Sequence, residues 1–202
     1  MGNQEDGSQG FLGDEILNFI PLFPTVIYTT NIRIDTDHIY SLLVGMEHDP
    51  HLHIANGTSS YEKDPHLLHN EVFTDLRSRI QLHVDEYAME LGLMPPEISN
   101  SWFNIMGKGS HFKPHTHQMS VVSGSFYVRS GGGSSPLTFV SPLQQLKMYE
   151  VAVQENQFNE NEKSIYNVSG DLILFPSWLL HYSMDNQFDE RCVIAFNTNY
   201  ET

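Results

Sequence analysis

The spacing of apolar residues changes from a helical to a strand-like pattern about half-way along the chain. In the first half, one run of apolar residues recurs every three or four positions, which places them on one face of an α-helix. Its members are Phe73, Leu76, Ile80, Val84, Tyr87 and Leu91. Gly92 and Pro95–Pro96 are expected to end this helix, because glycine favours helix ends and proline cannot continue a helix.

Two shorter elements are predicted before this helix. The β-branched and aromatic residues of Val26–Ile32 indicate an early strand. Asp35 is a plausible N-cap of a helix, since the apolar residues Ile39, Leu42 and Leu43 follow with helical spacing. Residues 48–66 show no period and contain several turn-forming residues, so we expect a loop there.

After Ser101 the pattern becomes that of strands. The apolar stretches are short, rich in β-branched and aromatic residues, and bounded by Gly, Pro, Ser and Asn. They read SWFNIM, SVVSGSFYVRS, SPLTFV, YEVAVQE, SIYNV, GDLILFPSW and RCVIAFNTNY. About seven strands at short spacing are typical of a sandwich or jelly roll. The glycine-rich RSGGGSSP is interpreted as a turn, because strands continue on both sides of it.

This order of elements favours one mainly β domain with flanking helices (α+β). The chain of 202 residues has a length usual for one domain. We assign residues 11–202 to that domain, with helical support over 35–95 and the β core over 100–200. The polar and acidic residues 1–10 are expected to form a disordered tail.

Composition limits the partners and the compartment. The net charge of −15 repels a phosphate backbone, so a nucleic-acid duplex is not expected as a partner. No apolar run reaches the length of about 18 residues that a membrane helix needs. A single cysteine, Cys192, cannot form an internal disulfide, and the start of the chain does not look like a signal peptide. The expected location is the cytoplasm, or the host cytoplasm if a phage encodes the chain.

Eleven histidines exceed the ten lysines and arginines, and position must separate candidate metal ligands from the rest. His83 and Asp85 lie on the long predicted helix, where residues two apart point in different directions and cannot share an ion. The loop residues His48, His51 and His53 are interpreted as a polar surface, with a mobile lid over a site elsewhere as the alternative.

His115 and His117 have the spacing that a metal site in extended chain requires. Residues two apart in extended chain project to the same side, so both imidazoles can reach one ion. His111 is the second choice, because it would lie about 13 Å from His115 in extended chain. His181 follows the predicted buried strand Leu172–Phe175 and is the candidate for a third ligand across the barrel.

Arg191 is the other candidate site residue. It opens the apolar strand RCVIAFN in a chain with few basic residues. Its ordinary interpretation is an arginine that is ion-paired or extends to the surface. The functional interpretation is a guanidinium fork that binds a carboxylate through two hydrogen bonds.

Together these residues resemble the Fe(II)/2-oxoglutarate-dependent oxygenases. The resemblance rests on HTH, a following strand with SGSFYV, the later GDLILFPSWLLH, and an arginine ten residues after its histidine. It covers about Pro21–Asn199 and is closest to a small, prolyl-4-hydroxylase-like branch found in marine bacteria and phages. It implies a double-stranded β-helix (jelly roll), with the N-terminal helices packed on one sheet and one iron ion bound at a mouth of the barrel.

The resemblance also implies roles for individual residues. His115 takes the place of the first metal ligand and His181 that of the distal histidine. Arg191 would pair with the far carboxylate of 2-oxoglutarate, and Tyr127 would help to bind it. Asn104 matches, more weakly, an asparagine that contacts the same cosubstrate in a related branch. No catalytic residue is expected beyond the metal ligands.

His117 departs from the family pattern, which usually has a carboxylate there. Three explanations are open. His117 can itself be a ligand, which is the prediction adopted here. Water can fill an open position beside it, as in related halogenases. An acid from elsewhere, such as Asp171 or Asp185, can complete the site. Three neutral imidazoles would leave the ion its full charge and reduce selectivity for iron.

The resemblance implies a hydroxylase that couples decarboxylation of 2-oxoglutarate to oxidation of a substrate, with Fe(II) as cofactor and ascorbate as a stimulant. Phe175, Trp178 and Tyr182 are expected near the metal, or simply in the barrel core. The expected partner is a small molecule or a peptide side chain, with a homodimer as the oligomer. A cupin-like jelly roll that binds a metal or ligand without redox turnover is the alternative, and a structural phage or surface protein is the third.

Overall fold

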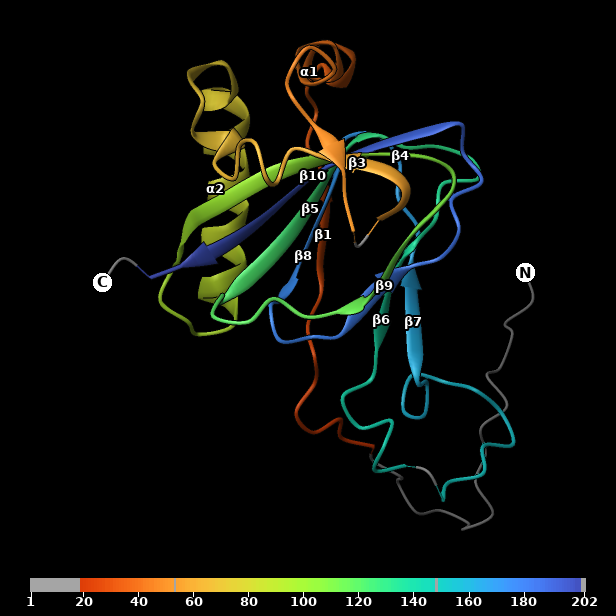
Figure 1. Ribbon diagram of the computed structural model, residues 1–202. Helices are drawn as coiled ribbons and strands as arrows, with labels where there is room; N and C mark the ends of the chain where they lie inside the picture. The colour runs from red at the N-terminus through yellow and green to blue at the C-terminus, as the bar shows by residue number, and fades with distance from the viewer. Residues whose placement is uncertain (1–18, 53, 148, 201–202) are drawn as a thin grey trace, which may run out of the picture.

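The fold is a single antiparallel sheet that curls into a jelly roll, with helices on its outside (Figure 1). The computed structural model describes residues 19–52, 54–147 and 149–200. The ten strands are β1 Tyr28–Asn31, β2 Asp49–Pro50, β3 Ile54–Ser59, β4 Glu97–His115, β5 Val122–Arg129, β6 Leu137–Val140, β7 Glu162–Ile165, β8 Asp171–Pro176, β9 His181–Ser183 and β10 Glu190–Asn199. Their order is β1-β8-β5-β10-β4-β9-β6-β7, and β3 joins β2 to β4. The predicted fold class is thus confirmed.

Both predicted helices are present. α1 spans Thr36–Leu43, and its N-cap is Asp35, whose side chain accepts a hydrogen bond from the His38 N–H. α2 spans Thr74–Glu90 and is followed by Gly92 in the left-handed region at φ +69°. Two short 3-10 helices, Leu67–His69 and Glu71–Phe73, lead into α2. No helix in the described part of the chain is long and apolar enough to cross a membrane.

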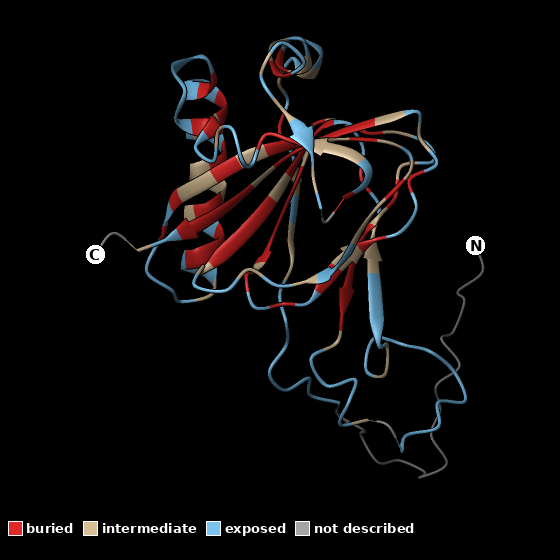
Figure 2. Ribbon diagram, in the orientation of Figure 1, coloured by how far each residue is buried: buried red, intermediate tan, exposed pale blue. Residues whose placement is uncertain are grey.

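Alternation along the strands separates two cores. On β10, Cys192, Ile194 and Phe196 face outward and pack with the apolar face of α2. The residues between them face into the barrel, where Val193 packs with Tyr127 and others. Figure 2 shows how buried residues concentrate along the central strands. Since side chains alternate between the two faces of a strand, each central strand contributes residues to both cores. The inward residues of β10 can therefore line a site inside the barrel.

Three sequence predictions about strands are wrong. Residues 48–66 are not only loop, since β2 and β3 lie there and β3 pairs with β4. YEVAVQE forms no strand; Val151 and Val153 are almost fully exposed, because no neighbouring strand pairs with them. The short strand β9 was not predicted. Strand formation at these places depends on the pairing partner more than on local propensity.

Other boundaries differ as well. The first strand is shorter than Val26–Ile32, and the strand predicted to begin near Ser101 begins at Glu97 and runs on to His115. The tail over residues 1–10 lies outside the described residues, and the division into domains stays a prediction.

Gly124 on β5 tests the packing of the outer core. A Cβ atom there would lie 2.1 Å from Cζ of Phe196, which is buried. We expect Gly124→Ala to lower the free energy of unfolding by about 1–3 kcal/mol, as in other overpacked cores. Urea titration followed by circular dichroism measures this change. Gly132→Ala is the matched control, because nothing lies within 4 Å of its Cβ position; equal urea midpoints for the two variants would contradict the account.

Candidate metal and cosubstrate site

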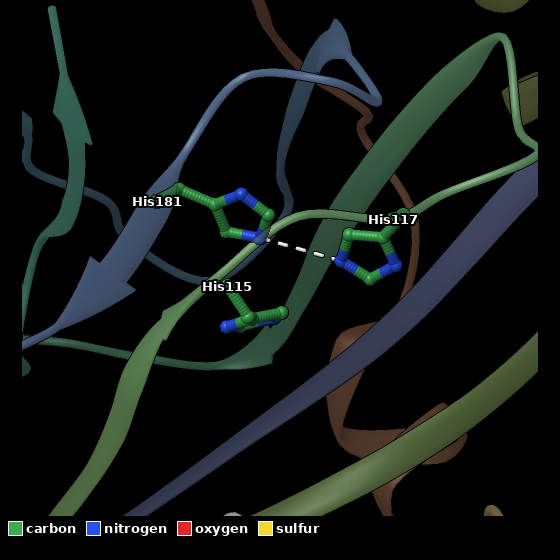
Figure 3. A group of neighbouring side chains, drawn as sticks. All are labelled: His115, His117 and His181. Atoms are coloured by element: carbon green, nitrogen blue, oxygen red, sulfur yellow. Dashed lines mark hydrogen bonds between the residues drawn. The ribbon is translucent and has the colours of Figure 1, made fainter.

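Three histidines converge at one end of the barrel (Figure 3). His115 is the last residue of β4, and His181 is the first residue of β9 and its partner in the antiparallel register. His117 follows β4, and its backbone N–H donates to the Ser177 carbonyl at 2.9 Å. One ring nitrogen from each histidine lies within 4.8 Å of the other two. Residues far apart in the sequence thus present three metal-ligand atoms to one point.

Backbone carbonyls orient two of the three rings. Nδ1 of His115 lies 2.8 Å from the Lys113 carbonyl, and Nδ1 of His181 lies 2.8 Å from the Leu179 carbonyl. A carbonyl only accepts, so each Nδ1 carries the proton and each Nε2 keeps its lone pair. This is the arrangement usual for metal-binding histidines. In both rings the nitrogen available to a metal ion is therefore Nε2.

Burial keeps two of the three rings uncharged. Burial, and secondarily the nearby His115, lower the pKa of His117 to about 4. The same two causes lower the pKa of His181 to about 3. Both rings are thus neutral near pH 7, which is the form that binds metals.

The distances also fit a divalent ion. Nε2 of His117 lies 3.3 Å from Nε2 of His181, drawn as the dashed line in Figure 3. Two nitrogens that each lie about 2.0–2.1 Å from one ion, at a tetrahedral or octahedral angle, are roughly 3 Å apart. The three imidazole nitrogens and the distance between them therefore fit one divalent metal ion.

No acid joins the cluster in the described residues. Asp171 instead accepts hydrogen bonds from the Asn31 side chain and the Val168 N–H. Oδ1 of Asp185, the other proposed acid, lies 3.0 Å from Nδ1 of His111, the second-choice histidine. These two side chains thus pair with each other. These contacts favour His117 over Asp171 or Asp185 as the third protein ligand. His53 lies outside the described residues.

A narrow cavity of about 70 Å³ connects the three histidines with Arg191. It is lined mainly by residues of β4, β5, β9 and β10. Since about 10–15 Å³ of such space holds one water, the cavity suits a small molecule. Phe175 and Tyr182 line it, as expected, whereas Trp178 does not line it and is 57% exposed.

Arg191 is buried, with only 3% of its surface exposed. Its Nη1 lies 3.1 Å from Sδ of Met106, and its Nη2 lies 3.5 Å from the Tyr127 hydroxyl. Its guanidinium carbon lies 5.1 Å from the centre of the Tyr127 ring. Nε has no hydrogen-bond partner, and no carboxylate of the described residues forms an ion pair with Arg191. A buried charge without a counter-ion is costly, so this side chain suits an anionic ligand.

Of the two other predicted cosubstrate residues, Tyr127 contacts Arg191 and Asn104 lines the cavity. Tyr127 is fully buried beneath Arg191, and burial raises the pKa of its phenol, which keeps it a neutral donor. Asn104 lines the cavity and is 4% exposed, and its Oδ1 has no partner within the described chain.

Sequence reasoning missed the residues that support His117. Trp102 stacks on the His117 ring, with 6.2 Å between ring centres and 28° between planes. Ser177, whose carbonyl holds the His117 N–H, bonds through its hydroxyl to Ser123, and Ser123 donates to Asn197. The available signal was spacing along a strand: Trp102 lies two residues before Asn104, and Ser123 lies four residues before Tyr127.

Residues 100–197 match the model of a protein family described as "Putative 2OG-Fe(II) oxygenase". The matched residues make up just under half of the chain and include the three histidines and Arg191. The match indicates an Fe(II)/2-oxoglutarate-dependent oxygenase, as the sequence resemblance predicted. Its placement in a marine or phage branch stays a prediction. No curated protein matches the sequence.

Solved structures of 2OG-Fe(II) oxygenases share the fold. HygX from Streptomyces hygroscopicus, with nickel and 2-oxoglutarate bound, is 11% identical with a TM-score of 0.60, over 87% of this chain and 83% of its own. A Pseudomonas putida prolyl-4-hydroxylase is 13% identical with a TM-score of 0.57, over 88% and 94%. The epimerase SnoN from nogalamycin biosynthesis is 11% identical with a TM-score of 0.64, over 88% and 79%. At such identities the likeness establishes the fold alone.

Substitution of His117 tests whether this side chain coordinates the metal ion. We expect His117→Ala to weaken Fe(II) binding at least about tenfold, because loss even of a supporting group costs 10–100-fold. His117→Asp should retain the ion, because a carboxylate there gives the two-histidine-one-carboxylate set that suits Fe(II). Competition with a fluorescent chelator, without oxygen, measures both affinities.

The exposed His38→Ala is the matched control and should bind as the wild type does. Wild-type affinity in His117→Ala would place His117 outside the ligand set. Circular dichroism of each variant reports whether the fold is kept.

Proposed function

We propose that this oxygenase binds Fe(II) through His115, His117 and His181 and binds the far carboxylate of 2-oxoglutarate through Arg191. Tyr127 and the side-chain N–H2 of Asn104 complete the cosubstrate site, because the 2-oxoglutarate dianion only accepts hydrogen bonds and leaves the Asn104 oxygen to another ligand. The reaction is hydroxylation of a C–H bond of a small-molecule substrate. The single observation that carries the proposal is the buried Arg191, which has no carboxylate partner in the described chain and lines the same cavity as the three histidines.

The shape of the cavity supports a short dicarboxylate. One end presents neutral imidazoles that suit a metal ion, and the other end presents a guanidinium. A ligand that satisfies both ends needs a metal-binding group and, a few bonds away, an anion. 2-Oxoglutarate has both, since its keto acid can chelate a metal while its second carboxylate stays free. A monocarboxylate would leave one end unsatisfied.

When bound, the iron supplies the redox chemistry, in which O2, 2-oxoglutarate and the substrate C–H bond give succinate, CO2 and an alcohol. The chain's residues bind and orient the reactants. Arg191 can grip a carboxylate with two N–H donors, and the hydroxyl of Tyr127 lies beside it to fix the fork. The apolar walls from Phe175 and Leu137 exclude water, which strengthens the charge pair.

Neutral imidazoles set the charge of this site. Without a carboxylate ligand, the ion keeps its full 2+ charge, and Arg191 adds another positive charge nearby. The cavity therefore favours a dianion more strongly than a site with a carboxylate ligand would. A cupin-like protein that only binds a metal would have no use for a buried guanidinium without a counter-ion.

The substrate belongs to the outer part of the site. Among the structural relatives, HygX has been solved with hygromycin B bound and SnoN with nogalamycin RO. These ligands are small molecules, which supports a small molecule here as well. The peptide side chain that the prolyl-4-hydroxylase resemblance implies stays the second candidate. The homodimer and the cytoplasmic location stay predictions.

Loss of Arg191 should abolish tight cosubstrate binding. Removing one partner of a buried charge pair costs about 2–5 kcal/mol, so Arg191→Ala should weaken 2-oxoglutarate binding by roughly 30-fold or more. Arg191→Lys should recover only part, because an ammonium group cannot reproduce the fork. Titration calorimetry with Fe(II) and without O2 measures the affinities.

Arg79→Ala is the control, since Arg79 is exposed on α2 and pairs only with Asp75 in the described chain. The Fe(II) affinity of each variant, measured separately, shows whether the histidine cluster is intact. Unchanged 2-oxoglutarate affinity in a folded, metal-binding Arg191→Ala protein would refute the role of Arg191.

A further inference from the structure

A larger groove of about 860 Å³ lies outside the narrow cavity. Its walls come from β4 and β10, from the segment 61–66 that follows β3, and from the segment 116–120 that follows β4. It shares Trp102, Asn104, Phe112, His115 and His117 with the inner cavity. A molecule in the groove therefore reaches the histidine cluster from outside the inner cavity, and Arg191 does not line the groove.

An aromatic corner dominates one wall of the groove. The rings of Tyr61 and Trp102 meet edge to face, with centres 5.0 Å apart at 81°. Tyr61 is 39% exposed and Trp102 is half-buried, so both present ring surface to the groove. Trp102 also stacks on His117. A ligand on these rings is thus placed beside the proposed metal ligands.

The remaining lining is polar but mostly uncharged. Amide side chains lie along it at Asn100, Asn104, Gln118, Asn197 and Asn199. The amide oxygens of Asn100 and Asn104 are buried and have no hydrogen-bond partner within the described chain. Glu62 and Lys113 also line the groove and carry opposite charges. The groove thus selects by hydrogen bonding and ring stacking, and its unpaired acceptors require donors from the ligand.

We infer that the groove binds a glycoside: a polyhydroxylated sugar ring that packs its C–H face on Trp102 and Tyr61 and donates hydroxyl hydrogens to Asn100 and Asn104. That this glycoside is the substrate rests on the proposed function, whereas its binding in the groove does not. Aromatic ring faces carry partial negative charge and attract the polarised C–H groups of a sugar. Sugar hydroxyls supply the donors that the two amide oxygens lack.

A proline-rich peptide fits this groove less well. Such a peptide would also pack on exposed aromatic rings. Proline residues have no backbone N–H, however, so a run of prolines offers acceptors and no donors. It would leave the oxygens of Asn100 and Asn104 unpaired, and a site with unpaired buried polar groups rejects such a ligand. The hydrogen-bonding pattern therefore favours the sugar.

Saturation-transfer difference NMR on the full chain tests the inference. The protein is loaded with Zn(II) and 2-oxoglutarate, so that no turnover occurs. The probes are a mixture of maltose, cellobiose, sucrose and chitobiose, and separately an acetylated tetraproline peptide with a C-terminal dimethylamide, which has no N–H donor. We expect saturation of sugar ring protons in at least one disaccharide and none in the peptide. Tyr61→Ala and Trp102→Ala should each reduce the sugar signal at least about fivefold, the size expected for loss of one aromatic contact.

Trp178→Ala is the matched control, because Trp178 is exposed and lines neither the groove nor the cavity. Tyr61→Ala guards against misfolding, since Tyr61 lies outside the core. No signal from any disaccharide, a signal from the peptide alone, or a sugar signal that survives both variants would overturn the inference. The 2-oxoglutarate protons in the same spectra report on the inner site: their loss with sugar binding retained would overturn the proposed function and leave the groove assignment standing.

Discussion

The antiparallel pairing of β4 with β9 is the constraint on which the site depends. It sets His115 directly opposite His181, although the two are 66 positions apart in the sequence. β9 has three residues, and its other neighbour, β6, fixes it from the far side through Phe139. A shift of this register by one residue would turn one of the two imidazoles to the opposite face. The pairing therefore determines whether a three-histidine cluster exists.

A second consequence follows from the alternation along β10. Outward residues such as Ile194 and Phe196 pack against the helical layer, and inward residues line the cavity. Arg191 is the first inward residue of this strand, so the packing that holds β10 in place also holds the guanidinium. The helices contribute to function in this indirect way: their buried face fixes the strand that carries the anion-binding group.

The charges of the site oppose those of the whole chain. The protein has a net charge of −15, yet its barrel contains a buried guanidinium and no ion-paired carboxylate beside it in the described residues. One narrow cavity contains both the histidine cluster, which can hold a metal ion, and Arg191, which can bind a carboxylate. Because like charges in a dry interior cost free energy, the arrangement is best explained by a dianionic cosubstrate.

Much of this could be predicted from sequence, but not all. The spacing of His115 and His117 and the apolar strand before His181 identified the candidate ligands, and the helical period located α2. β3, β9 and the exposed course of YEVAVQE could not be predicted, because their state depends on which strand lies beside them. The groove around Trp102 and Tyr61 was missed for the same reason, since its walls come from segments that only the folded sheet brings together.

A crystal structure with Fe(II) and 2-oxoglutarate, prepared without oxygen, tests the central claim most directly. The account predicts one ion bonded to His117 and to Nε2 of His115 and His181, at about 2.0–2.2 Å. It also predicts the far carboxylate of 2-oxoglutarate on the Arg191 guanidinium. An ion that leaves out His117 or His181, or a 2-oxoglutarate bound away from Arg191, would contradict the account.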